Sequence, residues 1–135
     1  FFFKQKTAYE IPKRDWSSDV CSSDLDPVFG PIVLVGDGGK YVEALPDLQV
    51  LIPPFSQQDA VEALYRLRIA PLLDGVRGDL PLDVNAFCQA AVAVGCLMVD
   101  KKLGINQLDI NPIMVGSLGQ GCTALDAVIY RKEIE

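Results

Sequence analysis

Short hydrophobic runs bounded by glycine or proline dominate the pattern of this 135-residue chain. Residues 31–35 and 48–52 are continuous apolar runs with the length and flanking residues of buried strands. Residues 41–45 form a further candidate extended piece. Two later runs, 108–113 and 124–127, flank a connection rich in glycine, a pattern that predicts a β-hairpin at the end of the chain.

Two stretches between these strands carry helical periodicity. The first is predicted to start after an N-cap at Ser56 and to continue to about Ile69, where Pro71 ends it. Asp83 is predicted to cap a second helix, which spans about 84–103. The order β, β, α, α, β, β predicts an α+β fold: a mainly antiparallel sheet with two helices on one face.

The predicted hairpin places oxygen-bearing side chains among aliphatic ones. If it closes symmetrically about Leu118 and Gly119, Asn111 lies opposite Asp126, and Asp109 shares their face. Such a cluster suits a hard divalent cation such as Mg²⁺, which takes oxygen ligands. The same spacing fits a half-buried hairpin with a polar outer face, and a one-residue bulge would break the pairing. Spacing alone leaves both interpretations open.

Two loops carry further candidate residues. Gly36, Gly38 and Gly39 follow the first strand and suggest a phosphate-binding loop. No Ser, Thr or helix follows them, however, so a tight turn or bulge is the alternative. Glu43 can reach a cation or a substrate, or remain solvated. Arg77 stands between glycines and suits a carboxylate or phosphate, or it can brace its own loop against neighbouring aspartates.

Composition narrows the partners. The net charge is -6, with 12 basic and 18 acidic residues and no basic stripe, which argues against nucleic acid. Histidine is absent, and the 4 cysteines show neither a CxxC pair nor zinc spacing, which favours a reducing, cytoplasmic setting. The longest apolar run, 84–99, is interrupted by polar residues and shorter than the roughly 20 residues of a membrane span. No membrane partner is expected.

Residues 1–25 differ from the rest of the chain. Residues 17–24 have neither helix nor strand periodicity, and residues 15–25 look like a translated sequencing-adapter read-through. We therefore expect 1–25 to be a non-native or disordered lead-in. The domain is expected to span 26–131, truncated at its N-terminal side, with a polar tail at 132–135.

Four motifs in a fixed order carry a resemblance to a known family. They are Asp-Pro-Val-Phe-Gly-Pro at 26–31, the glycine segment at 36–43, Pro-Leu-Leu-x-Gly-Val-Arg-Gly at 71–78 and Asp-Ile-Asn-Pro at 109–112. Together they resemble the ATP-grasp domain of NDP-forming, chiefly ADP-forming, acyl-CoA synthetases. This is the acetate–CoA ligase family, related to the succinyl-CoA synthetase β subunit. The resemblance covers nearly all of 26–130 and implies the C-terminal part of the domain.

The resemblance implies a site for Mg²⁺ bound to ATP or ADP. The metal ligands would be Asn111 and Asp126, with Asp109 as the acidic residue of the motif, the same pairing that hairpin symmetry gives. The cofactor-binding glycines Gly36, Gly38 and Gly39 would lie by the phosphates.

The implied reaction is acyl-CoA + ADP + phosphate ⇌ acid + CoA + ATP, through acyl phosphate and phosphohistidine. The adenine-binding lobe, the CoA-binding domain or subunit and the phosphohistidine lie outside the resemblance, so we expect the chain alone to be inactive. Arg77 and Glu43 are its catalytic candidates. Two alternatives are a synthetase-like regulatory module of a protein-lysine acetyltransferase and a non-catalytic subunit-interaction module.

Overall fold

The computed structural model describes residues 2–7, 30–37 and 47–132, apart from the side chains of 2–7, 37, 111 and 112. Its helices and strands confirm the predicted α+β class. Along the chain they are β1 (Phe2–Thr7), β2 (Val33–Asp37), β3 (Leu48–Leu51), α1 (Gln57–Tyr65), α2 (Ala70–Leu73), α3 (Val84–Val99), the 3₁₀ turn η2 (Lys101–Leu103), β4 (Ile105–Val115), β5 (Cys122–Ala124) and β6 (Ala127–Arg131).

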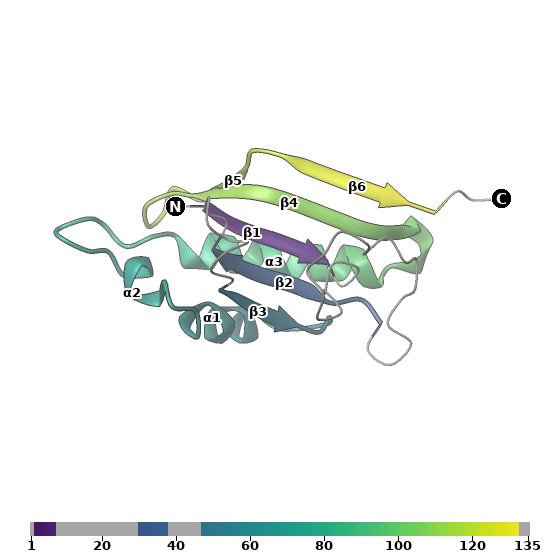
Figure 1. The fold of residues 1–135 in the computed structure, drawn as a ribbon, viewed down its shortest axis with the longest axis horizontal. Helices are drawn as coiled ribbons and strands as arrows, with labels where there is room; N and C mark the ends of the chain where they lie inside the picture. The colour runs from purple at the N-terminus through teal and green to yellow at the C-terminus, as the bar shows by residue number, and fades with distance from the viewer. Residues whose placement is uncertain (1, 8–29, 38–46, 133–135) are drawn as a thin grey trace.

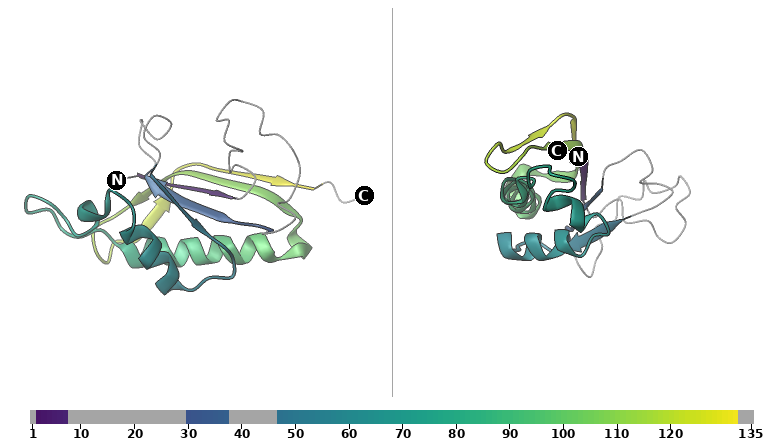
Figure 2. Two further views of the ribbon diagram at one scale, coloured as in Figure 1. Left: turned by 60° about the horizontal axis from the view of Figure 1, so that its bottom comes forward. Right: turned by 90° about the vertical axis from the view of Figure 1, so that its left-hand side faces the viewer.

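The strands form one antiparallel sheet in the order β3-β2-β1-β4-β5, and β6 follows β5 along the same edge of β4. Helices α1 and α3 cover one face of this sheet, as the turned views show (Figures 1 and 2). The predicted layering, an antiparallel sheet with helices on one face, is therefore confirmed. The hairpin arm of β5 and β6 lies at the edge, away from α1.

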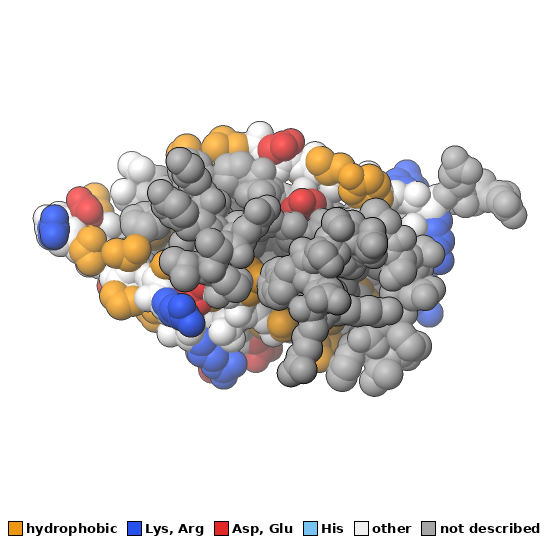
Figure 3. Space-filling model, in the orientation of Figure 1, with side chains coloured by type: hydrophobic (Ala, Val, Ile, Leu, Met, Phe, Trp, Pro, Cys, Tyr) orange, Lys and Arg blue, Asp and Glu red, His pale blue; other side chains and the backbone are white. Residues whose placement is uncertain are grey.

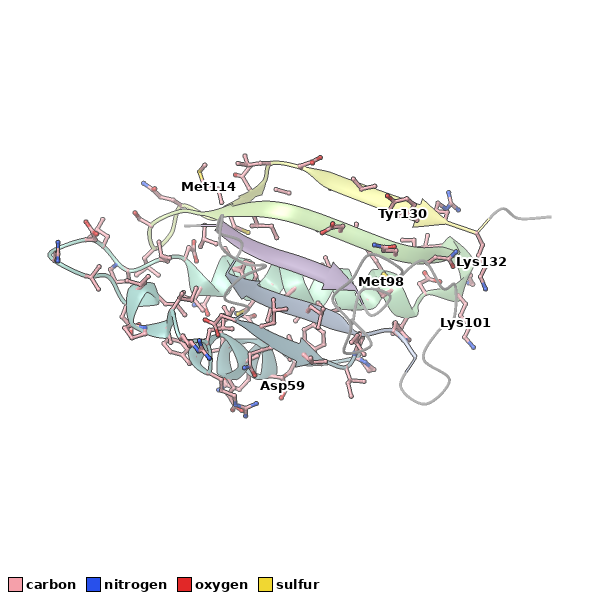
Figure 4. All side chains as sticks on the ribbon, in the orientation of Figure 1. Asp59, Met98, Lys101, Met114, Tyr130 and Lys132 are labelled. Carbon is pink, nitrogen blue, oxygen red and sulfur yellow. The ribbon has the colours of Figure 1, made fainter. Side chains whose placement is uncertain are left out.

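The core lies between the helices and the sheet, because each element turns one apolar face inward. Met98, labelled in Figure 4, belongs to the α3 part of this core. Its largest fully buried side chain, Phe87 of α3, is 1% exposed. The strands contribute Val33, Val35, Leu51, Leu108, Ile113 and Val115, and the helices contribute Ala60, Ala63, Leu64, Phe87, Cys88, Ala91, Val94 and Met98. Burial of each large aliphatic or aromatic side chain stabilises the fold by about 1.5–3 kcal/mol.

Both predicted N-caps are confirmed. The Ser56 side chain accepts a hydrogen bond from the Asp59 amide, and the Asp59 carboxylate accepts one from the Ser56 amide, which completes a capping box. Asp83 caps α3, which ends at Val99. A short 3₁₀ turn follows, and Gly104, in the left-handed conformation with φ +60°, ends it. Across the described ranges, no helix is long and apolar enough to cross a membrane.

The predicted end of the first helix was wrong by one turn. Helix α1 ends at Tyr65 and not near Ile69. The reason is a distant acceptor: one carboxylate oxygen of Asp47 accepts hydrogen bonds from the amides of Arg68 (2.7 Å) and Ile69 (3.3 Å). Those amides are thereby drawn out of the helical pattern, and Pro71 lies in the first turn of α2, where its missing N–H costs nothing.

Residues 2–7, at the start of the expected non-native or disordered lead-in, form β1, which pairs with β2 on one side and β4 on the other. Without β1, the facing edges of β2 and β4 would each leave backbone groups unpaired, so an extended segment is favoured there despite its polar composition. The non-native origin of 1–25 stays a prediction, and residues 8–29 lie outside the described part.

Candidate metal and nucleotide site

The hairpin has the predicted register on both sides of the proposed site. The two ladders pair Ile113 with Ala124 and Ile110 with Ala127. Asn111 of β4 and Asp126, which lies in the short break between β5 and β6, therefore stand at the same level of the sheet. The symmetric closure expected from the sequence is confirmed, whereas metal binding by these residues stays a prediction.

A β-bulge lies at this level on the other side of β4. The β1 ladder pairs Phe3 with Ile113 and Gln5 with Ile110. Two residues of β4, Asn111 and Pro112, consequently face the single residue Lys4. Pro112 has no N–H to give to a ladder, so a bulge is where a proline fits in a central strand. The bulge leaves the hairpin register intact.

The bulge also changes which residues of β4 face the helices. Leu108 is buried in the core before it, and Ile113 and Val115 are buried in the core after it. Asp109 is half-buried, and its carboxylate oxygen Oδ1 is fully buried. Asp109 pairs with Val128, two residues beyond the exposed Asp126. Diagonal neighbours of this kind lie roughly 7–8 Å apart.

These residue types fit Mg²⁺ bound to a nucleotide. The two carboxylates and the amide are oxygen donors, and magnesium uses only one or two protein carboxylates together with phosphate oxygens and water. Among the described residues no group of three or more His, Cys, Asp or Glu side chains could hold a metal by itself. Metal binding at Asp109, Asn111 and Asp126 stays a prediction.

Gly36 is the one of the three predicted phosphate-loop glycines that the structure describes. It is buried in β2, and a Cβ added there would run into the carbonyl oxygen of Asp47 and the side chain of Leu48. Close approach of β3 is therefore a sufficient reason for glycine at this position. Gly38, Gly39 and Glu43 lie outside the described residues, so their predicted roles remain predictions.

Arg77 lies at the tip of the loop between α2 and α3. It has φ +53° and is followed by Gly78 with φ +87°, in a turn closed by a 3.0 Å hydrogen bond from the Asp79 amide to the Val76 carbonyl oxygen. Positive φ at both central residues defines a type I′ turn, in which Asn and Gly are favoured. Arg77 therefore occupies a position that costs an L-residue conformational energy.

The alternative in which Arg77 braces its own loop is not what the structure shows. Within the described residues its guanidinium makes no hydrogen bond or ion pair, and Asp74 accepts a 2.8 Å hydrogen bond from the Tyr65 hydroxyl instead. The loop that carries Arg77 protrudes at one end of the molecule, beyond the start of α3 (Figure 1). The structure does not bring it together with Asp109 and Asp126 in mid-hairpin.

Asp83 does more than the predicted capping. Its Oδ1 accepts from the Ala86 amide (3.2 Å), and its Oδ2 accepts from the amides of Gly119 (3.1 Å) and Gly121 (2.8 Å) in the hairpin connection. These hydrogen bonds lower the pKa of the Asp83 carboxyl below its usual value, and the bond from the Gly121 amide has the largest effect. Sequence reasoning missed this contact because the partners are 36 and 38 residues apart.

Backbone bonds complete the same junction. The amide of Asp83 donates to the carbonyl oxygen of Gly116 (2.8 Å), and that of Leu118 donates to Pro81 (2.8 Å). Leu82 and Ser117 form an isolated antiparallel bridge. The Arg77 loop and the hairpin connection are thereby held as one unit.

Comparison with known proteins places these observations in a family. The profile of the ATP-grasp domain matches residues 20–130. A 4-hydroxybutyrate–CoA ligase (ADP-forming) from Nitrosopumilus maritimus is 36% identical over 110 residues, which are 82% of this chain and 16% of that relative. Subunit beta of acetate–CoA ligase (ADP-forming) II from Pyrococcus furiosus is 36% identical over 107 residues, 79% of this chain and 45% of the subunit.

Solved structures with the same fold are similar to this chain over nearly its whole length. A crystal structure from Pyrococcus horikoshii superposes with a TM-score of 0.78 at 26% identity, covering 97% of this chain and 48% of that one. The dinucleotide-forming acetyl-coenzyme A synthetase 1 of Candidatus Korarchaeum cryptofilum, solved with coenzyme A and Mg-AMPPCP, superposes with a TM-score of 0.76 at 27% identity. The superposition covers 97% of this chain and 53% of the synthetase chain. The chain thus spans about half or less of these relatives.

Proposed function

Because this chain belongs to the ATP-grasp domain family, we propose that it forms the Mg·nucleotide-binding portion of an ADP-forming acyl-CoA synthetase. The full enzyme would interconvert acyl-CoA, ADP and phosphate with acid, CoA and ATP. Relatives named as ADP-forming CoA ligases, and a neighbour solved with coenzyme A and Mg-AMPPCP, support this assignment. The observation that carries it here is the hairpin register, which sets Asn111 opposite Asp126 beside the half-buried Asp109.

In this proposal the metal would be held by Asn111 and Asp126, with Asp109 next to them on β4. Bound Mg²⁺ supplies positive charge that offsets the negative charge of phosphate oxygens. The residues of this chain provide oxygen donors at a point of the hairpin that paired strand segments flank before and after it, which limits reorganisation when nucleotide binds. The β4 bulge and the break between β5 and β6 set the position of these donors along the sheet.

The chain would supply one wall of the nucleotide site and be inactive alone. Relatives extend well beyond it, so the remaining nucleotide contacts, the CoA-binding part and the acyl site would come from the rest of the ligase. The partners proposed are therefore a nucleotide, with CoA as co-substrate of the full enzyme, and the CoA-binding domain or subunit of the same synthetase.

The test is calorimetric titration of Mg·ATP into a longer polypeptide that restores the adenine-binding lobe. Replacing Asn111 and Asp126 together by Ala should weaken Mg-dependent binding by about 100-fold or more, since even partners outside the metal's ligand shell contribute 10–100-fold. Asn106→Ala with Asp79→Ala removes the same residue types elsewhere and should leave binding unchanged. Equal affinity in the site variant and the wild type would refute the assignment.

A further inference from the structure

Strand β6 forms an exposed edge of the sheet. It pairs with β4 on one side, and within the described residues no strand pairs with its other side. Every residue of β6 is exposed, and Val128, Ile129 and Tyr130 are 42%, 53% and 55% exposed. Figure 3 shows hydrophobic side chains gathered over β6, which runs along the upper edge in Figure 1. An exposed edge strand with apolar residues and no proline is a template for pairing with a further strand.

One hydrogen bond shows which backbone groups β6 directs outward. The Lys132 amide donates to the carbonyl oxygen of Gly104 (2.9 Å), so the backbone of Lys132 is directed towards β4. Successive residues of an antiparallel strand direct their N–H and C=O groups to alternate sides. The backbone groups of Ala127, Ile129 and Arg131 are therefore directed outward, where a second strand can bond to them.

A second copy of this chain can pair with this edge in only a few ways. Two copies related by a two-fold axis use the same residues on both sides of the interface, and their edge strands run antiparallel. Directly opposite residues lie on the same face of a sheet, so the axis passes through the level of one residue. Near the middle of β6 that residue is Val128, Ile129 or Tyr130. The side chains that each choice brings together decide between them.

The register centred on Ile129 brings complementary side chains together. Asp126 then lies opposite Lys132 of the second copy. Val128 lies opposite Tyr130 of the second copy, and Ile129 lies opposite its own equivalent. Opposite charges and aromatic–β-branched pairs are favourable cross-strand combinations. An axis at Val128 would instead set Asp126 opposite Tyr130, and an axis at Tyr130 would set Val128 opposite Lys132.

Arg131 fits the same register. Its Nε donates a 2.9 Å hydrogen bond to the carbonyl oxygen of Leu103, so the guanidinium is held by its own chain. With the axis at Ile129, Arg131 lies opposite Ala127 of the second copy, a small residue that leaves this bond in place. The two other registers would set Arg131 opposite a larger aliphatic side chain.

We propose that β6 is the interface of a homodimer, in which two copies pair antiparallel about Ile129 and join their sheets into one. The outward backbone groups form the new ladder, and the Asp126–Lys132 ion pair occurs twice by symmetry. An unrelated strand would have to supply a cation opposite Asp126 and an anion opposite Lys132, whereas a second copy supplies both. This pairing does not rest on the proposed function.

Sedimentation velocity of the 135-residue chain over a dilution series tests the proposal. EDTA is present, because Asp126 is also a proposed metal ligand. The wild type should change from monomer to dimer as its concentration rises. Ile129→Asp sets two carboxylates opposite each other at the axis and should weaken dimerisation about 10-fold or more, the loss expected for an interface anchor. Ile52→Asp is the matched control, since Ile52 is 52% exposed at the end of β3, the opposite edge of the sheet.

The charge pair gives a second test, which a variant that merely weakened the strand would fail. Lys132→Asp sets like charges opposite each other at both ends of the interface and should weaken dimerisation at least about 5-fold. Combining it with Asp126→Lys reverses the pair and should restore the dimer. Lys101→Asp makes the same charge change in the exposed 3₁₀ turn and should leave dimerisation as it is.

Far-UV circular dichroism and thermal unfolding establish that each variant folds. A wild type that stays monomeric throughout the series would overturn the proposal. Species larger than a dimer would also overturn it, because a two-fold interface closes on itself. Equal weakening by Ile52→Asp and Ile129→Asp would show that β6 is not the interface. A double variant that dimerises as weakly as Lys132→Asp would refute the register.

Discussion

Replacing Arg77 by asparagine should make the isolated chain more stable. Arg77 has φ +53° at the first central position of a type I′ turn. The left-handed region costs an L-residue about 1–2 kcal/mol. Asparagine is several-fold enriched there, which corresponds to about 0.6–1 kcal/mol of relief. The guanidinium has no hydrogen bond or ion pair with the described residues, so the substitution removes no such contact from that part of the chain.

The expected gain in the free energy of unfolding is therefore about 0.5–1 kcal/mol. For a domain of this size it raises the unfolding temperature by about 2–5 °C. Thermal and urea unfolding, followed by circular dichroism at one pH and salt concentration, measure both quantities. Arg77→Gly should gain less, because glycine also increases the entropy of the unfolded chain by an amount worth about 0.4–1 kcal/mol.

Two matched variants make the interpretation specific. Arg68→Asn removes the same charge at an exposed position without positive φ, and its effect should stay within about 0.5 kcal/mol. Gly78→Ala places a Cβ at φ +87° and should destabilise the chain by about 1 kcal/mol. If Arg77→Asn lowers stability relative to Arg68→Asn, the arginine contributes to the fold, and the expected relief of backbone strain is refuted.

Two further predictions concern titratable groups. The folded-state pKa of Asp83 is lowered, so its stabilisation is complete above the unfolded pKa near 4 and is lost as the pH falls through the folded value. Urea midpoints of Asp83→Asn should thus be lower at pH 7 and fall less steeply towards pH 3 than those of the wild type; parallel curves would contradict this. Burial raises the pKa of the Cys88 thiol to about 12, whereas Cys96 is exposed. Iodoacetamide at pH 8 should modify Cys96 and spare Cys88 in the folded chain, as peptide mass spectrometry would show, and equal labelling would mean that the core opens.

What the sequence predicted well depends on local chemistry. The capping of α1 requires only Ser56 and Asp59, three residues apart, and the hairpin register requires only a short glycine-rich connection between two apolar runs. Turn length and side-chain alternation specify such a register. For that reason the position of Asn111 opposite Asp126 follows from the sequence of the hairpin alone.

The features that sequence reasoning missed all depend on distant partners. The helical pattern does not resume after α1 because Asp47, more than 20 residues upstream, accepts the amides of Arg68 and Ile69. The bulge opposite Asn111 exists only because β1 pairs with β4 in a shifted register. The Asp83 junction needs the hairpin connection to fold back on α3. No periodicity within one segment encodes such contacts.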